Sequence, residues 1–162
     1  MAGFYWTKEA EKYFNDLGKS SSFGKIGARG KLIVGNKFDM YFLCLNVGLS
    51  EAKILDGKIT EEVTRDPPMP YKKESVKSQL FAALVSTELE RKGIQVRRNR
   101  EQIKKLMLKM INLRDSYDLS EEAYTLLNKY ANKGFELISK KITKPKDMDT
   151  FYSNIHKHFI KE

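Results

Sequence analysis

MYFLCLNVGL, residues 40–49, is the segment that decides the fold, and within it Met40–Leu45 is the longest apolar run of the chain. Asn36 precedes this segment as a predicted N-cap, with Asp39 at the third helical position. We therefore expect a helix from Asn36 to about Gly48. Apolar residues occur on every side of that helix, so it is predicted to be buried at the centre of the protein.

A shorter helix is predicted near the N-terminus. Thr7 is its expected cap and Gly18 its expected end. The helical spacing of four apolar residues supports it: Ala10, Tyr13, Phe14 and Leu17.

The middle of the chain predicts two further helices. The first covers residues 74–92, with Gly93 as the residue just beyond its C-terminus. The second begins at Asn99, which resembles a capping box together with Gln102. Its apolar stripe is expected to comprise Ile103, Leu106, Met107, Met110 and Ile111.

The C-terminal part predicts a long helix capped by Ser120 and a short terminal one. The long helix has Tyr124, Leu127, Ala131, Phe135 and Ile138 along one side, and the short one is marked by Phe151, Ile155 and Phe159. Gly134 lies inside the long helix. An interior glycine costs about 1 kcal/mol relative to alanine, so we expect close packing against another helix there.

No segment alternates with the period of a strand, and no internal repeat is present. The predicted fold class is therefore all-α, a single-domain bundle of about five to six helices. The expected layout over 1–162 is an N-terminal helix at 1–18, a basic glycine-rich loop at 19–37 and a helical core at 38–162. Prolines in PPMP, residues 67–70, predict an extended connector within 50–72, where a short hairpin is the alternative.

Charge and cysteine usage restrict the functional classes. The chain has 162 residues, with 30 Lys and Arg against 21 Asp and Glu, a net charge of +9. This balance favours a polyanionic partner, most commonly nucleic acid. The single Cys44 cannot form an internal disulfide, which fits a reducing cytoplasm. Met40–Leu45 is far shorter than the roughly 20 apolar residues of a membrane span, so we expect a soluble cytoplasmic protein without a membrane partner.

The sequence contains no recognisable catalytic or metal-binding set. His156 and His158 fall on different faces of a predicted helix and have no metal-ligand partners at suitable spacing. Cys44 lies in an apolar run, which favours a core position over a nucleophile. Gly18–Lys31 lacks the spacing of a phosphate-binding loop. We therefore expect a protein that is not an enzyme and that uses no metal or cofactor.

Basic residues are concentrated in three segments. Residues 91–109 hold eight basic side chains against one acid, Glu101, a net +7. Residues 18–37 hold five basic residues and no acid, and a lysine cluster covers 140–146. The predicted phosphate-binding residues are Lys25, Arg29, Lys31, Arg97, Arg98, Arg100, Lys104 and Lys105. The alternative is an ordinary solvated face. No base-reading motif is present, so contact with the nucleic-acid backbone is the better prediction.

Two segments resemble the DndE family of DNA sulfur-modification proteins: GARGKLIVGNKFDMYFLCLNVGLS, residues 27–50, and LLNKYANKGFELISKKITKPKDMDTF, residues 126–151. The similar features are the core run Leu43–Leu45 with Gly48, the step Asn132-Lys133-Gly134 before Leu137, and the tail Asp147–Phe151. The resemblance implies a small, helical, non-catalytic DNA-binding component of a phosphorothioation system that recognises DNA discontinuities such as nicks and works as an oligomer.

Three features depart from that family pattern: a longer N-terminus, the proline-rich connector and the basic stretch 97–100. We therefore expect a DndE-like accessory subunit of a bacterial DNA-modification or anti-phage defence complex that binds double-stranded DNA beside larger protein subunits. The alternative is an adaptor that docks a larger ATPase, helicase or nuclease through apolar surface without binding DNA itself.

Overall fold

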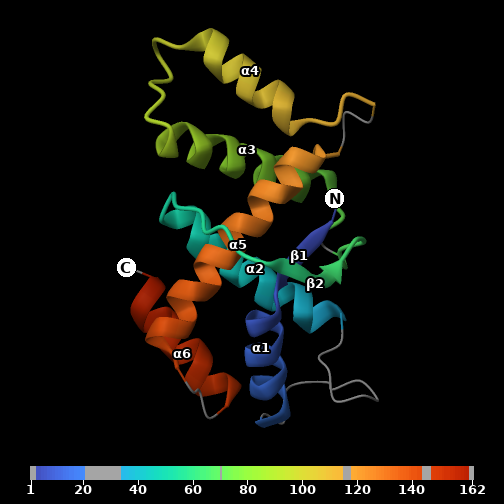
Figure 1. The fold of residues 1–162 in the computed structure, drawn as a ribbon, viewed down its shortest axis with the longest axis vertical. Coiled ribbons are helices and arrows are strands. Elements are labelled where there is room, and N and C mark those ends of the chain that lie inside the picture. The colour runs from blue at the N-terminus through green and yellow to red at the C-terminus, as the bar shows by residue number, and fades with distance from the viewer. Residues whose placement is uncertain (1–2, 21–33, 70, 115–117, 144–146, 161–162) are drawn as a thin grey trace.

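The structure is a computed structural model that describes residues 3–20, 34–69, 71–114, 118–143 and 147–160. These residues form six helices and two short strands (Figure 1). In chain order the elements are β1 (Phe4–Thr7), α1 (Lys8–Ser20), α2 (Val34–Ser50), β2 (Ile59–Thr64), α3 (Glu74–Arg91), α4 (Arg100–Met110), α5 (Glu121–Lys141) and α6 (Met148–Phe159). The protein is largely helical, and the prediction of a purely all-α fold is wrong because it omits a small sheet.

The crossing of α2 and α5 forms the centre of the protein (Figure 1). Two glycines let the helix backbones touch. A Cβ atom added to Gly48 would collide with the carbonyl oxygen of Tyr130, and one added to Gly134 would collide with that of Cys44. Small residues allow such close approach because they carry no side chain to separate the backbones. The predicted close packing at Gly134 is therefore confirmed.

Burial of α2 on several sides is also confirmed. Tyr41 and Leu45 are fully buried, and Cys44 is 2% exposed. The apolar residues predicted along α5 are all buried as well, and so are Phe151 and Ile155 of α6. Among the described helices, none is both long enough and apolar enough to cross a bilayer.

The small sheet pairs the N-terminal strand with a distant segment. β1 is antiparallel to β2, with Phe4 opposite Thr64. The Asn128 side chain of α5 accepts a hydrogen bond from the Tyr5 backbone N (3.0 Å) and donates one to the Gly3 carbonyl (3.1 Å). β2 thus lies in the predicted connector, but it pairs with β1 rather than forming a hairpin there. β1 has four residues, all of them buried, so it carries no polar–apolar alternation.

The helix ends follow some of the predicted caps. The Thr7 side chain accepts from Ala10 N (3.3 Å), and the Ser120 side chain accepts from Ala123 N (3.1 Å), as predicted. The predicted stop at Gly18 and the predicted cap at Asn36 are wrong, because α1 continues to Ser20 and α2 begins at Val34. A cap contributes only about 1 kcal/mol, and tertiary packing supplies most helix stability, so packing can move an end by a few residues.

Candidate nucleic-acid interface

The predicted phosphate-binding residues divide into two groups. Lys25, Arg29 and Lys31 lie outside the described residues. The other five lie together at the junction of α3 and α4, in a segment that we call the basic corner: Arg97, Arg98, Arg100, Lys104 and Lys105. In Figure 1 this junction lies at one end of the long axis of the molecule.

Backbone hydrogen bonds fix the turn that leads into the basic corner. Gly93 has a φ angle of +65°, as the prediction of a C-terminal glycine requires. Its N–H donates to the carbonyl of Glu90 (3.0 Å), and the N–H of Ile94 donates to that of Leu89 (2.9 Å). This is the Schellman pattern that ends a helix. The chain therefore leaves α3 in a defined direction.

All five side chains of the basic corner are exposed. Within the described part of the chain, none of them forms an ion pair or a side-chain hydrogen bond. Arg98 takes part only through its backbone N–H, which donates to the carbonyl of Gln95 (3.1 Å). Five cationic groups are thus exposed to solvent, and no carboxylate of the described residues neutralises them.

Two neighbouring cations, Arg91 and Lys92, form ion pairs with a buried carboxylate of the protein itself. Glu88 is fully buried, and its carboxylate accepts two hydrogen bonds from the Arg91 guanidinium (2.7 and 2.9 Å). It also accepts one from the Tyr130 hydroxyl (2.7 Å) and lies 3.4 Å from the Lys92 ammonium. This network joins the end of α3 to the middle of α5 beside the basic corner.

The charge of Glu88 is stabilised in this network. Burial acts to raise the pKa of Glu88, but the hydrogen bonds from Arg91 and Tyr130 outweigh burial, so the pKa lies below its ordinary value. The hydrogen bonds of Glu88 raise the pKa of Arg91 in turn. Both groups therefore stay charged at neutral pH.

The N-terminus of α4 adds to the basic corner. Asn99 occupies the N-cap position, but its side chain makes no capping hydrogen bond, so the predicted capping box is wrong. First-turn amides without a side-chain cap can donate to an anion, and the helix dipole favours negative charge there.

Exposed apolar side chains accompany the charges. Val96 is 63% exposed and Leu108 is 48% exposed. Met107 was expected in the apolar stripe of α4 but is 38% exposed, whereas Leu106 and Met110 of that stripe are buried. α4 packs through a narrow stripe, which leaves Met107 at its edge.

The other basic segments do not join the basic corner within the described residues. The Lys37 ammonium lies 3.4 Å from the Glu11 carboxylate and donates to the carbonyl of Glu62 (2.6 Å), so it is a structural residue. Lys140 pairs with Glu136, and both lie in the half of α5 that leads away from α4 toward α6 (Figure 1). Lys144 and Lys146 lie outside the described residues.

The described residues assemble no metal-binding cluster of three or more His, Cys, Asp or Glu side chains. His156 and His158 are exposed, as expected for surface histidines. Cys44 is buried as predicted, and burial raises the pKa of its thiol. A buried neutral thiol is a poor nucleophile.

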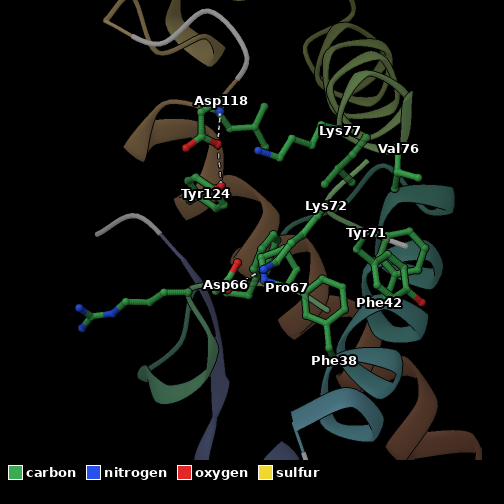
Figure 2. A pocket seen from close by; sticks show the side chains of 14 residues that line it. Phe38, Phe42, Asp66, Pro67, Tyr71, Lys72, Val76, Lys77, Asp118 and Tyr124 are labelled. Carbon is green, nitrogen blue, oxygen red and sulfur yellow. Dashed lines mark hydrogen bonds and ion pairs between the residues drawn. The ribbon is translucent and has the colours of Figure 1, made fainter. Parts of the chain in front are cut away.

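A pocket of about 370 Å³ lies at the other end of α3, where β1 and the segment after β2 meet α2 and the N-terminal parts of α3 and α5 (Figure 2). We call it the aromatic pocket because its walls include Phe4, Phe38, Phe42, Tyr71 and Tyr124. The sequence did not predict this pocket, because its lining residues are far apart along the chain, from Phe4 to Tyr124. The nearest signal was the spacing of aromatic residues at the start of α2.

Polar side chains, Asp118 and Lys77, also line the aromatic pocket. Asp118 is oriented by two hydrogen bonds to its Oδ1 atom, from the Tyr124 hydroxyl (2.9 Å) and from the backbone N of Leu119 (2.8 Å). Lys77 of α3 extends toward Asp118 in Figure 2. It is half-buried and forms no ion pair or side-chain hydrogen bond within the described part of the chain.

Comparison with known proteins provides no relative from which a function could be transferred. No protein-family model matches the chain. No curated protein and no solved structure matches it either.

Proposed function

We propose that this protein is a non-catalytic DNA-binding subunit that contacts the phosphate backbone through the basic corner. One observation carries the proposal: five cations are exposed in the turn between α3 and α4 and in the first half of α4, and no carboxylate of the described residues neutralises them. Arginine and lysine side chains with a helix N-terminus are the groups that proteins use to hold phosphates. Such contacts position a protein on DNA without reading its sequence.

The contrast with Arg91 and Lys92 supports this assignment. These two cations form ion pairs with Glu88, so their charge is compensated within the fold. Lys109 lies 3.7 Å from Glu122 in an exposed ion pair. The five cations of the basic corner alone keep their full charge for a partner among the eight basic residues of 91–109.

The decisive measurement is the salt dependence of binding to intact duplex, nicked duplex, single-stranded DNA and duplex RNA. Each phosphate contact contributes about 0.9 to the slope of log K against log salt, so five contacts give a slope of about −4.5. Arg97→Glu/Arg98→Glu/Arg100→Glu should flatten that slope by about 2.7. The form bound most tightly identifies the substrate.

A charge-matched control separates local contact from overall charge. Lys53→Glu/Lys58→Glu/Lys157→Glu reverses the same number of exposed cations elsewhere on the surface. We expect this variant to keep most of the slope. Equal losses in the two variants, or no binding by the wild type, would overturn the proposal.

The proposed place of the protein in a bacterial DNA-modification or anti-phage defence complex is supported by its sequence resemblance to the DndE family. Purification from the source cells should then recover larger subunits of such a machine together with DNA. Nuclease treatment should release the DNA. If the chain is recovered alone, it does not belong to such a complex. The proposal that the basic corner contacts DNA would not be affected by that result.

A second candidate function is an adaptor that docks a larger protein. Exposed apolar residues before α4 (Val96), within it (Leu108) and after it (Leu113) favour it. An adaptor would form a stoichiometric complex that nuclease does not affect and that Leu108→Glu disrupts. Ile160→Glu, at another exposed apolar position, is the matched control. A DNA-binding subunit would instead lose its DNA in the arginine variant.

A further inference from the structure

We propose that the aromatic pocket is a binding site for a nucleobase. The proposal concerns a different part of the molecule from the basic corner and stands independently of it. Lys77 precedes Arg91 by fourteen positions on α3, which corresponds to about 21 Å along the helix at 1.5 Å per residue.

The size and walls of the pocket suit a small flat ligand. Its volume of about 370 Å³ falls within the range of small-molecule sites. Phe42 and Tyr71 form part of its wall, and their ring centroids lie 4.9 Å apart. Both rings are only half-buried, which leaves ring surface for a ligand. Stacking on aromatic side chains is a common way for proteins to hold bases.

The polar groups define the chemistry of that ligand. Asp118 receives both of its hydrogen bonds on Oδ1, so Oδ2 is left to accept one from a ligand. Lys77 supplies a donor that no described residue uses. A purely apolar ligand would leave the Lys77 ammonium and the Oδ2 atom of Asp118 without a partner, and desolvating them would be costly. A simple anion would satisfy Lys77 and be repelled by Asp118.

A nucleobase satisfies both groups at once. Its edge carries an amino or imino donor beside a carbonyl or ring-nitrogen acceptor, which matches a carboxylate beside an ammonium group. The rim of the pocket carries Arg65 and Lys72. Each makes an exposed ion pair, with Glu62 and Asp66 respectively, and such pairs are weak enough for a phosphate to compete. The base would therefore enter first, with its sugar and phosphate toward the rim.

The base could come from a free mononucleotide or from an unpaired position in DNA. The first arm of the test titrates the protein with each of the four deoxynucleoside monophosphates and with 2-deoxyribose 5-phosphate, by calorimetry. The second arm compares a duplex that contains one unpaired base with the same duplex carrying an abasic site there. Preference for the base in the first arm identifies a free nucleotide, and preference in the second arm alone identifies DNA.

Two variants test the pocket itself. Lys77→Ala removes the free donor and is expected to fold normally because the side chain is only half-buried. Val76→Trp fills the cavity, and its thermal unfolding is checked alongside. We expect each to weaken base-dependent binding at least tenfold. Lys58→Ala and Gln79→Trp, at exposed positions outside the pocket, are the matched controls and should bind as the wild type does.

The outcomes separate this proposal from the DNA-backbone proposal. The Arg97→Glu/Arg98→Glu/Arg100→Glu protein should keep its affinity for mononucleotides even if it loses duplex DNA. Absence of a base preference in both arms would overturn the nucleobase site and leave the basic corner untouched. Equal weakening in the control variants, or retained binding in Lys77→Ala, would also overturn it.

Discussion

The α2–α5 crossing and the basic corner differ in how closely their residues are packed and in how far they are exposed. At the crossing, Gly48 and Gly134 bring two helix backbones into contact, and the surrounding residues are apolar and buried. At the basic corner, the chain turns through a Schellman motif and presents five cations that pair with no described carboxylate, together with exposed Val96 and Leu108.

This difference separates stability from binding. A side chain added at the crossing would clash with its neighbours, because protein interiors are close-packed and relax only partly. A side chain changed at the basic corner meets mostly solvent. Substitutions at the crossing should therefore alter the free energy of unfolding, whereas substitutions at the basic corner should alter the affinity for a polyanion.

The strongest test of this separation is Gly134→Ala. The new Cβ would overlap the Cys44 carbonyl, which belongs to the backbone and cannot move aside cheaply. We expect the free energy of unfolding to fall by about 3 kcal/mol, measured by urea denaturation. In the matched variant Gly93→Ala, no atom lies within 4 Å and only the positive φ angle is strained, at a cost of about 1 kcal/mol. Equal losses would show that the crossing is not the tighter site.

Glu88→Ala tests the boundary between the two regions. Removal of the carboxylate leaves the Tyr130 hydroxyl and the Arg91 guanidinium without their acceptor. We expect a loss of about 2 kcal/mol in the free energy of unfolding. Glu90→Ala removes an exposed carboxylate of the same helix and should change it by less than about 0.5 kcal/mol. If Glu88→Ala left the free energy of unfolding unchanged, α3 would not be anchored through this network.

The acid sensitivity of the fold should also depend on Glu88. Its pKa is lower in the folded protein than its ordinary value of 4.5, so it stabilises the folded state above that pH. This stabilisation is lost as the pH falls through the folded pKa. We therefore expect the melting temperature to fall less steeply below pH 4.5 in Glu88→Gln than in the wild type. Parallel curves for the two proteins would contradict this expectation.

The smallest effect on stability is expected at the basic corner. Lys104→Ala/Lys105→Ala should change the free energy of unfolding by less than about 0.5 kcal/mol, because both side chains are exposed and unpaired. The same variant should flatten the salt dependence of DNA binding by about 1.8. Lys53→Ala/Lys58→Ala is the control. A stability loss comparable to that of Glu88→Ala would mean that the basic corner is part of the packed fold.

Helices were largely predictable because their signals are local. Thr7 and Ser120 cap helices as their residue types suggest, and the burial of α5 follows its apolar spacing. The sheet was not predictable, because β1 is short and continuously buried and pairs with a strand more than fifty residues away. Long-range pairing of such a strand leaves no local pattern in the sequence.

The candidate site was only partly predictable for a related reason. A charge count over 91–109 cannot distinguish Arg91, which serves a buried carboxylate, from Arg97, which is free. The carboxylate of Glu88 lies one helical turn before Arg91, so that spacing was an available signal. The aromatic pocket had no comparable signal, because only the tertiary fold brings Lys77 and Asp118 to the same pocket.

The first strand cannot complete its contacts until Asn128, far along the chain, has been synthesised. The Tyr5 amide finds its acceptor on Asn128, which follows it by 123 residues. At ribosomal rates of 5–20 residues per second, that interval is about 6–25 s. Throughout this time β1 lacks the contact that fastens it to α5, and α2 lacks the helix that crosses it. The nascent N-terminal part therefore keeps its most apolar surfaces uncovered until the last third of the chain emerges.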